Sequence, residues 1–126
     1  MTVVLDASAV LVLLLDEPGA ETVAGVLGDA VLSAVNLAEV LGKLGDRGAD
    51  VAGLGDHLTA AGVAVHAMTE ADAAVVAELR RLDTGRVLSL GDRCCLALGR
   101  RLSAVVVTAD RAWSDLDMGV EVRQVR

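Results

Sequence analysis

Two kinds of apolar pattern alternate along the chain: short continuous stretches, and longer segments in which apolar residues recur every three or four positions. The continuous stretches predict buried strands, and the helical spacing predicts helices. The predicted strands are residues 2–5, 31–32 and 104–107, together with a short alternating strand at 63–66 and an edge strand at 120–122. The predicted helices are residues 7–15, 21–27, 33–44, 51–61, 69–82 and 90–102, with a helical turn at 110–114. Within residues 33–44, we expect Val35, Ala38 and Leu41 to face the core, with Leu37 and Leu44 as further candidates.

The alternation of strands and helices indicates an α/β fold. Continuous apolar strands need cover on both faces, which helices supply in mainly parallel sheets. The 126 residues fall within the usual size of one domain, and no linker or repeat interrupts them, so we predict a single domain over residues 1–126. Ligands of such sheets bind beyond the carboxyl ends of the strands. Residues that directly follow strands are therefore the first candidates for a functional site.

The composition limits where the protein resides and what its core contains. The longest apolar run, residues 9–15, is far shorter than the roughly 20 residues that cross a bilayer, and no basic stretch marks a secretory signal. We expect no membrane span and a cytoplasmic protein. Tyr and Phe are absent, so Val, Leu and Ala must fill the core, with Trp113 as its one aromatic anchor. Cys94 and Cys95 are expected to be reduced, buried thiols.

The charge is negative overall and unevenly distributed. A net charge of -7 argues against binding nucleic acid through bulk electrostatics. Nine of the eleven basic residues nevertheless follow residue 79. These arginines either contact phosphate near an acidic site or form solvated helix faces, and the charge pattern leaves both open.

Four carboxylates stand where the fold predicts a site. Asp6 and Asp110 follow predicted strands, whereas Glu39 and Asp92 lie on predicted helices. Each has an ordinary structural explanation. Asp6 and Asp110 are suitable helix N-caps, and Asp92 suits the first turn of its helix. Glu39 is spaced for an ion pair with Lys43.

If the four carboxylates converge, they need a cation. Unneutralised carboxylates at contact distance repel one another strongly. Ligands that offer only oxygen suit Mg²⁺ or Mn²⁺ and disfavour zinc. A metal held by carboxylates beside a phosphate is the arrangement for hydrolysis of phosphodiesters.

The four carboxylates stand in four distinctive segments: VVLDASAVLVLLLDEPG, LSAVNLAEVLGKL, LSLGDRCCLALGRRL and VVVTADRAWSDL. Together, and in this order, these segments resemble the PIN-domain ribonucleases, above all the VapC-type toxins of bacterial toxin–antitoxin pairs. The resemblance runs from Val3 to about Val122. It implies a PIN-like sheet of four or five mainly parallel strands with helices on both faces.

The resemblance also implies an activity and partners. The protein would be a Mg²⁺- or Mn²⁺-dependent endoribonuclease that acts on RNA as the toxin of a toxin–antitoxin pair. A cognate antitoxin with a basic tail would inhibit it by entering the acidic groove, and a homodimer is expected.

Specific residues take roles by their place in the motifs. Asp6, Glu39 and Asp92 would be the core metal ligands, and Asp110 would complete the site directly or through water. Three polar residues would orient carboxylates or water, although turn or cap hydrogen bonds explain them as well: Ser8, Asn36 and Thr108. Asp115 or Asp117 could add a further ligand. His57 and His66 match no motif and are expected at the surface.

Two other functions compete with this interpretation. A phosphatase with an aspartyl nucleophile would need a second carboxylate two residues after Asp6, where Ser8 stands instead. A non-catalytic PIN-like module that binds RNA or protein is the other, and the loss of a core carboxylate would have supported it, but all four are present. A protein that used the acids merely as caps would show no stabilisation by divalent cations.

Overall fold

The computed structural model describes all 126 residues, which form one five-stranded sheet. Every pair of neighbouring strands is parallel, and their order is β3-β2-β1-β4-β5. The strands are β1 (Val3–Leu5), β2 (Ala30–Ser33), β3 (Ala64–His66), β4 (Val105–Thr108) and β5 (Val122–Gln124). The predicted α/β fold with a mainly parallel sheet of four or five strands is therefore confirmed.

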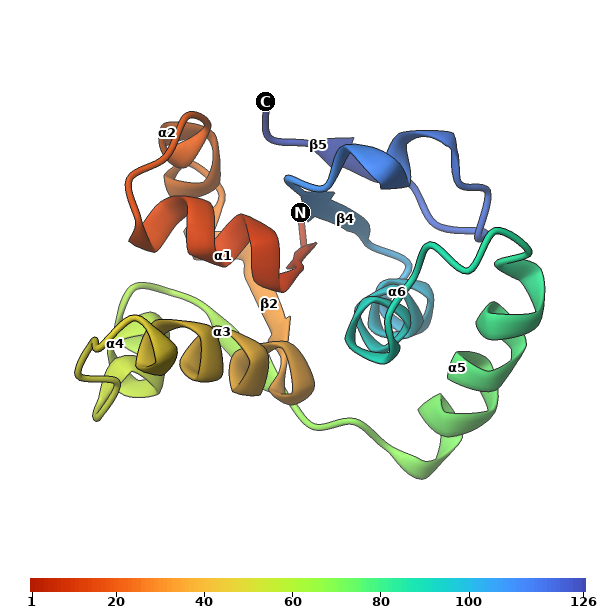
Figure 1. Ribbon diagram of the computed structural model, residues 1–126, viewed down its shortest axis with the longest axis horizontal. Coiled ribbons are helices and arrows are strands. Elements are labelled where there is room, and N and C mark those ends of the chain that lie inside the picture. Colours follow the sequence, from red (N-terminus) through yellow and green to blue (C-terminus); the bar gives the residue numbers. More distant parts are fainter.

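Helices cover both faces of the sheet, as Figure 1 shows. The helices are α1 (Ala7–Leu14), α2 (Ala20–Ala24), α3 (Ala34–Asp46), α4 (Leu54–Ala60), α5 (Glu70–Leu82) and α6 (Leu90–Leu102). Two short 3₁₀ turns, η1 (Leu27–Asp29) and η2 (Arg111–Asp115), complete the fold. None of the helices is both long and apolar enough to cross a membrane.

Successive residues of β1 point into two separate cores, because side chains alternate across a strand. Val3 and Leu5 pack with α1 to α4, whereas Val4 packs with α5 and α6. The second core also contains Trp113, which is fully buried as predicted. Cys94 and Cys95 are buried free thiols, which is also as predicted.

The buried face of α3 differs in part from the prediction. Leu44 is buried, as expected, but Ala38 is exposed and Val35 and Leu41 are only half-buried. The other buried residues are Asn36 and Val40. Val40 packs in the core with Leu44, and Asn36 donates a hydrogen bond to the backbone of α6, so the inner face of α3 combines apolar contacts with one polar contact.

Three predicted elements differ clearly in their bounds. The predicted helix 51–61 is shorter and spans Leu54–Ala60. The predicted helix 21–27 ends early, at Ala24, and only its last residue, Leu27, belongs to η1. The predicted edge strand 120–122 is shifted to Val122–Gln124, where Val122 pairs with Val106 and Gln124 with Thr108. Gly119 precedes it with a φ of 73°, a conformation that favours glycine and suits a turn rather than a strand.

Candidate active site

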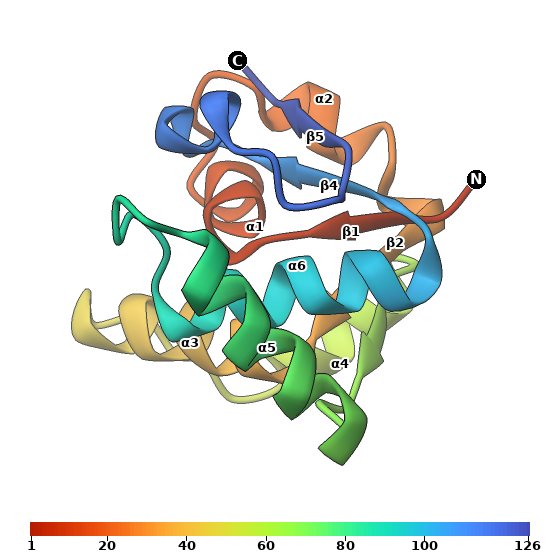
Figure 2. The ribbon, with the colours of Figure 1, turned by 90° about the vertical axis from the view of Figure 1, so that its right-hand side faces the viewer.

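The carboxyl ends of β1 and β4 place two of the four carboxylates at the same edge of the sheet. Asp6 directly follows β1, and Asp110 follows β4 by two residues. The two strands are neighbours, and Leu5 pairs with Val107. Figure 2 shows that β1 ends at the side of the molecule where α6 begins, which is where Asp92 lies.

Asp6 is almost completely buried and accepts a network of hydrogen bonds. Its Oδ1 accepts from the backbone N–H of Ala9 at 2.8 Å, and its Oδ2 accepts from the hydroxyl of Thr108 at 2.6 Å. The hydroxyl of Ser8 lies 2.7 Å from Oδ1 and 2.9 Å from Oδ2. Ser8 in turn accepts a hydrogen bond from the N–H of Ala109. Ser8 and Thr108 thus tie Asp6 to the turn that follows β4.

Burial nevertheless makes the Asp6 carboxylate costly to ionise. Burial raises the pKa of Asp6 from 3.8 to about 6, although the hydrogen bonds from Thr108, Ala9 and Ser8 lower it. The negative charge of Asp92 contributes to the rise. The loss of solvation therefore outweighs three favourable hydrogen bonds.

Glu39 is held by a neighbouring amide on the same helix. The Nδ2 group of Asn36 donates to Oε1 of Glu39 at 2.8 Å and to the backbone carbonyl of Gly91 at 3.0 Å. Asn36 is only 1% exposed, and its Oδ1 has no hydrogen-bond partner. This amide joins α3 to the first turn of α6.

Asp92 is the electrostatic centre of the group. It forms a capping box with Ser89, in which each side chain accepts a hydrogen bond from the other residue's backbone N–H. Burial raises the pKa of Asp92, and the charges of Glu39 and Asp110 raise it further. The negative charge of Asp92 also raises the pKa of Asp6. Asp92 is thus the member of the group that interacts electrostatically with each of the other three carboxylates.

Asp110 is exposed and caps the turn η2. Its Oδ1 accepts from the N–H of Ala112 at 2.9 Å. Asp115 and Asp117 are exposed as well, and they line a groove of about 320 Å³ together with residues such as Val87. Neither is among the charges that raise the pKa of Asp92.

Each of the four carboxylates accepts a hydrogen bond from a nearby group of this chain. No three His, Cys, Asp or Glu residues lie close enough together to hold a cation as they stand. This follows from their charge, because carboxylates with no cation between them repel and instead accept local hydrogen bonds.

The residues fit a hard divalent cation by their chemistry. All four offer carboxylate oxygen, the ligand that Mg²⁺ and Mn²⁺ prefer. The salt bridges of the structure involve Asp29, Glu78 and Asp72, so no basic side chain neutralises the four carboxylates. A buried, unpaired carboxylate such as Asp6 is costly unless a cation compensates it.

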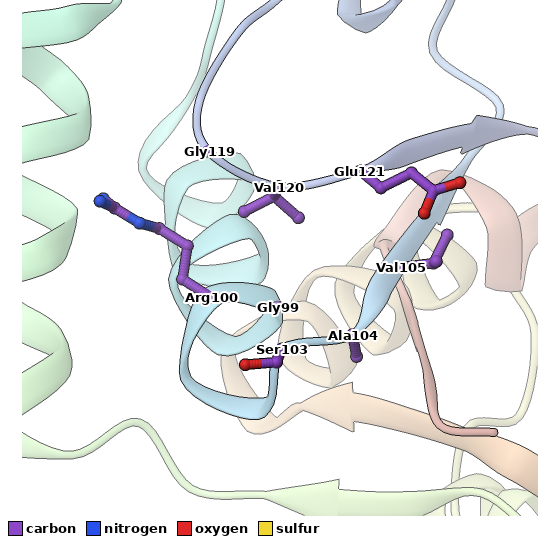
Figure 3. Close-up of a pocket in the computed structure, with 8 residues that line it drawn as sticks. All are labelled: Gly99, Arg100, Ser103, Ala104, Val105, Gly119, Val120 and Glu121. Carbon is purple, nitrogen blue, oxygen red and sulfur yellow. The ribbon is translucent and has the colours of Figure 1, made fainter.

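The largest cavity lies away from the carboxylates. Its volume is about 350 Å³, and it is lined by the end of α6, the start of β4 and residues 119–121. Figure 3 shows that Arg100 and Glu121 extend in opposite directions, so charged groups do not converge on this cavity. It adjoins the amino end of β4, whereas the carboxylates lie at the carboxyl end.

Sequence reasoning did not identify two residues that shape the site. Ser89 could have been found, because Ser followed three residues later by Asp is the pattern of a capping box. Gly91 could not, since nothing in the sequence indicates that its backbone lies against Glu39.

Known structures with the same fold include toxins of bacterial toxin–antitoxin pairs. A toxin–antitoxin complex from Klebsiella pneumoniae superposes with a TM-score of 0.76 at 12% identity, covering 99% of this chain and 98% of that chain. The DNA-bound VapBC complex of Salmonella typhimurium gives 0.75 at 14% identity, covering 100% and 99%. The VapC20 toxin of Mycobacterium tuberculosis, described as cleaving the sarcin–ricin loop, gives 0.68 at 17% identity, covering 90% and 93%.

The sequence itself matches a known domain family. No curated protein sequence matches the chain. Residues 3–118, however, match the PIN domain, and this range includes all four carboxylates. Because the match spans most of the chain, the protein belongs to the PIN-domain family.

Proposed function

We propose that this protein is a divalent-metal-dependent endoribonuclease and the toxin of a VapBC-type toxin–antitoxin pair. The observation that carries the proposal is the Asp6 carboxylate, which is 3% exposed, has no cationic partner and interacts with the charge of Asp92, which in turn interacts with Glu39 and Asp110. Membership of the PIN-domain family supports the nuclease activity, and the similarity to solved toxins supports the biological role.

Asp6, Glu39 and Asp92 would hold Mg²⁺ or Mn²⁺, and Asp110 would complete the site. A bound cation would supply positive charge beside the scissile phosphate and would lower the pKa of the attacking water, so that the water loses its proton more readily. The remaining steps belong to the side chains of this chain. Thr108 and Ser8 fix the orientation of Asp6, and Asn36 fixes that of Glu39.

Asp110 is the residue best placed to move a proton. It is exposed, and its Oδ1 caps η2, while no hydrogen bond within the chain occupies its Oδ2. A carboxylate in this position accepts the proton of an attacking water as a general base.

The proposed partner is an antitoxin with a basic tail. The four carboxylates form no salt bridge within the chain, so Arg or Lys side chains from another protein would find unpaired acceptors there. Inserted cations would neutralise the carboxylates and prevent RNA from approaching. A complex with the cognate antitoxin tests this, because a structure with no basic side chain near Asp6 or Asp92 would rule it out.

A homodimer also stays a prediction, to be tested by the mass of the protein in solution.

Cleavage of total cellular RNA tests the enzymatic proposal. The native protein should cut RNA at discrete positions with Mg²⁺ or Mn²⁺ and should lose this activity in EDTA. Asp92→Asn should be inactive, whereas Asp56→Asn should be active. Asp56 is a matched control, since it occupies the third position of α4 just as Asp92 does in α6, but is exposed.

The competing proposal is a PIN module that binds RNA or protein without cutting it. Native protein that stays folded but cleaves no RNA with either cation would favour this module. In that case, native and Asp92→Asn proteins would also bind Mn²⁺ equally poorly.

A further inference from the structure

The first turn of α6 contains a glycine that its backbone does not require. Gly91 lies between Leu90 and Asp92, and it is absent from the residues with positive φ. Alanine stabilises a helix better than glycine. Another feature must therefore exclude a side chain at this position.

That feature is the carboxylate of Glu39. A β-carbon added at Gly91 would lie 2.6 Å from Cδ and 2.7 Å from Oε2 of Glu39, and it would collide with Oε1 as well. Its three nearest neighbours are all atoms of the Glu39 side chain. The carboxylate therefore packs directly on the backbone of α6, in the space that any side chain at position 91 would fill.

Asn36 holds the carboxylate in this place. Its Nδ2 group donates to both Oε1 of Glu39 and the carbonyl of Gly91, so one amide bridges the two residues. The Oδ1 atom of Asn36 is buried without a partner, an arrangement that disfavours the folded state. The Asn36 side chain thus contributes to the folded state through the two hydrogen bonds that its Nδ2 group donates. Figure 2 shows α6 beginning beside α3, which is the junction that this amide spans.

We propose that Gly91 is a positioning residue that lets Glu39 pack on the first turn of α6, one residue from Asp92, so that both carboxylates face the same cation. The proposal rests on the proposed function, since the cation is what the two carboxylates would share. Two residues at the start of α6 then contribute to the site. Asp92 is a ligand, and Gly91, which has no side chain, leaves the space in which Glu39, the second ligand, is held.

A double-mutant cycle tests the proposal through binding of Mn²⁺, measured by calorimetry. Gly91→Ala should weaken Mn²⁺ binding by about 10- to 100-fold, as loss of a residue that orients a ligand does. Glu39→Asp, whose carboxylate is one methylene shorter, should also weaken binding. The double variant should bind no more weakly than Glu39→Asp alone, because the shorter side chain leaves room for the methyl group. Unchanged affinity in Gly91→Ala, or losses that multiply in the double variant, would overturn the proposal.

The matched control is Gly45→Ala. Gly45 lies in α3, and a β-carbon there would meet nothing within 4 Å. This variant should raise the unfolding temperature slightly and leave Mn²⁺ binding unchanged. Weakened Mn²⁺ binding in Gly45→Ala would show that any added methyl group disturbs the site, and this too would overturn the proposal.

Thermal unfolding in EDTA tests the same contact without metal. Gly91→Ala should unfold at a lower temperature than the native protein, and Gly91→Ala combined with Glu39→Ala should unfold higher than Gly91→Ala alone. If Gly91→Ala does not fold, removal of the Glu39 side chain should restore folding. Failure of that restoration would place the collision elsewhere and overturn the proposal. Native protein that binds no Mn²⁺ would instead contradict the proposed function, while the unfolding comparison would still decide whether Gly91 positions Glu39.

Discussion

The hydroxyl of Thr108 donates a 2.6 Å hydrogen bond to Oδ2 of Asp6, joining the ends of two neighbouring strands from residues 102 positions apart. This bond favours the charged carboxylate, yet the pKa of Asp6 is still raised to about 6 by burial. The protein therefore retains a buried negative charge that destabilises its metal-free form at neutral pH.

Replacing Asp6 with Asn should stabilise the metal-free protein. A carboxyl group whose pKa is raised on folding binds more protons in the folded state between pH 3.8 and about 6. The free energy of unfolding therefore falls as the pH rises through that range, by an amount on the order of 3 kcal/mol. At pH 7.5 in EDTA, Asp6→Asn should be more stable than the native protein by up to about this amount.

Urea unfolding at several pH values measures this difference. The stability advantage of Asp6→Asn should shrink toward zero at pH 3.5, where Asp6 is protonated in both states. An advantage that does not change between pH 3.5 and 7.5 would show that the charge of Asp6 is not its source.

Removing the Thr108 hydroxyl should shift the pH dependence of metal binding. The hydrogen bond from Thr108 lowers the pKa of Asp6, so Thr108→Val should raise this pKa further. Protons would then compete with the cation up to a higher pH. Titrations between pH 5 and 8 measure how the affinity for Mn²⁺ falls as the solution becomes more acidic. In Thr108→Val this fall should begin at a higher pH than in the native protein. In Thr22→Val, a variant of an exposed residue on α2, it should begin at the same pH as in the native protein.

Divalent cations should stabilise the native fold. Ligand present at 100 times its dissociation constant adds about 2.7 kcal/mol to the free energy of unfolding. Mg²⁺ should therefore raise the unfolding temperature of the native protein and of Asp56→Asn, but not that of Asp92→Asn. An equal rise in all three proteins would place the bound cation elsewhere.

The thiol of Cys95 should resist modification while the protein is folded. Burial raises the pKa of Cys95 well above its usual value, and the side chain is fully buried. Since the thiolate is the reactive form, a maleimide should label Cys95 only as fast as the protein unfolds. Mass spectrometry of peptides from native and urea-unfolded protein measures this. Rapid labelling of Cys95 under native conditions would reveal local opening of α6.

The centre of the sheet could be predicted from the sequence because β1, β2 and β4 come from continuous apolar runs, which are stable only in a core covered on both faces. Asp6 and Asp110 could be placed at the carboxyl edge for the same reason, since each follows such a run. These inferences need only local patterns and the general geometry of parallel sheets.

The rotation of α3 could not be predicted in this way. Apolar spacing favoured Ala38 on the inner face, but Asn36 lies there instead and donates a hydrogen bond to the carbonyl of Gly91. The role of Gly91 depends on the same contact between residues 55 positions apart. A sequence pattern reports the periodicity within a helix, whereas both of these features arise from how two helices meet.

The strand order has a consequence for how the protein is made. β1 lies at the centre of the sheet and is synthesised before its neighbour β4, which is supplied by residues 105–108. A nascent chain that lacks those residues has neither the hydroxyl of Thr108 nor the carboxylate of Asp110, and the neighbouring strand on one side of β1 is missing. The arrangement of residues around Asp6 therefore arises only after β4 has been synthesised, so the proposed nuclease would stay inactive on the ribosome until then.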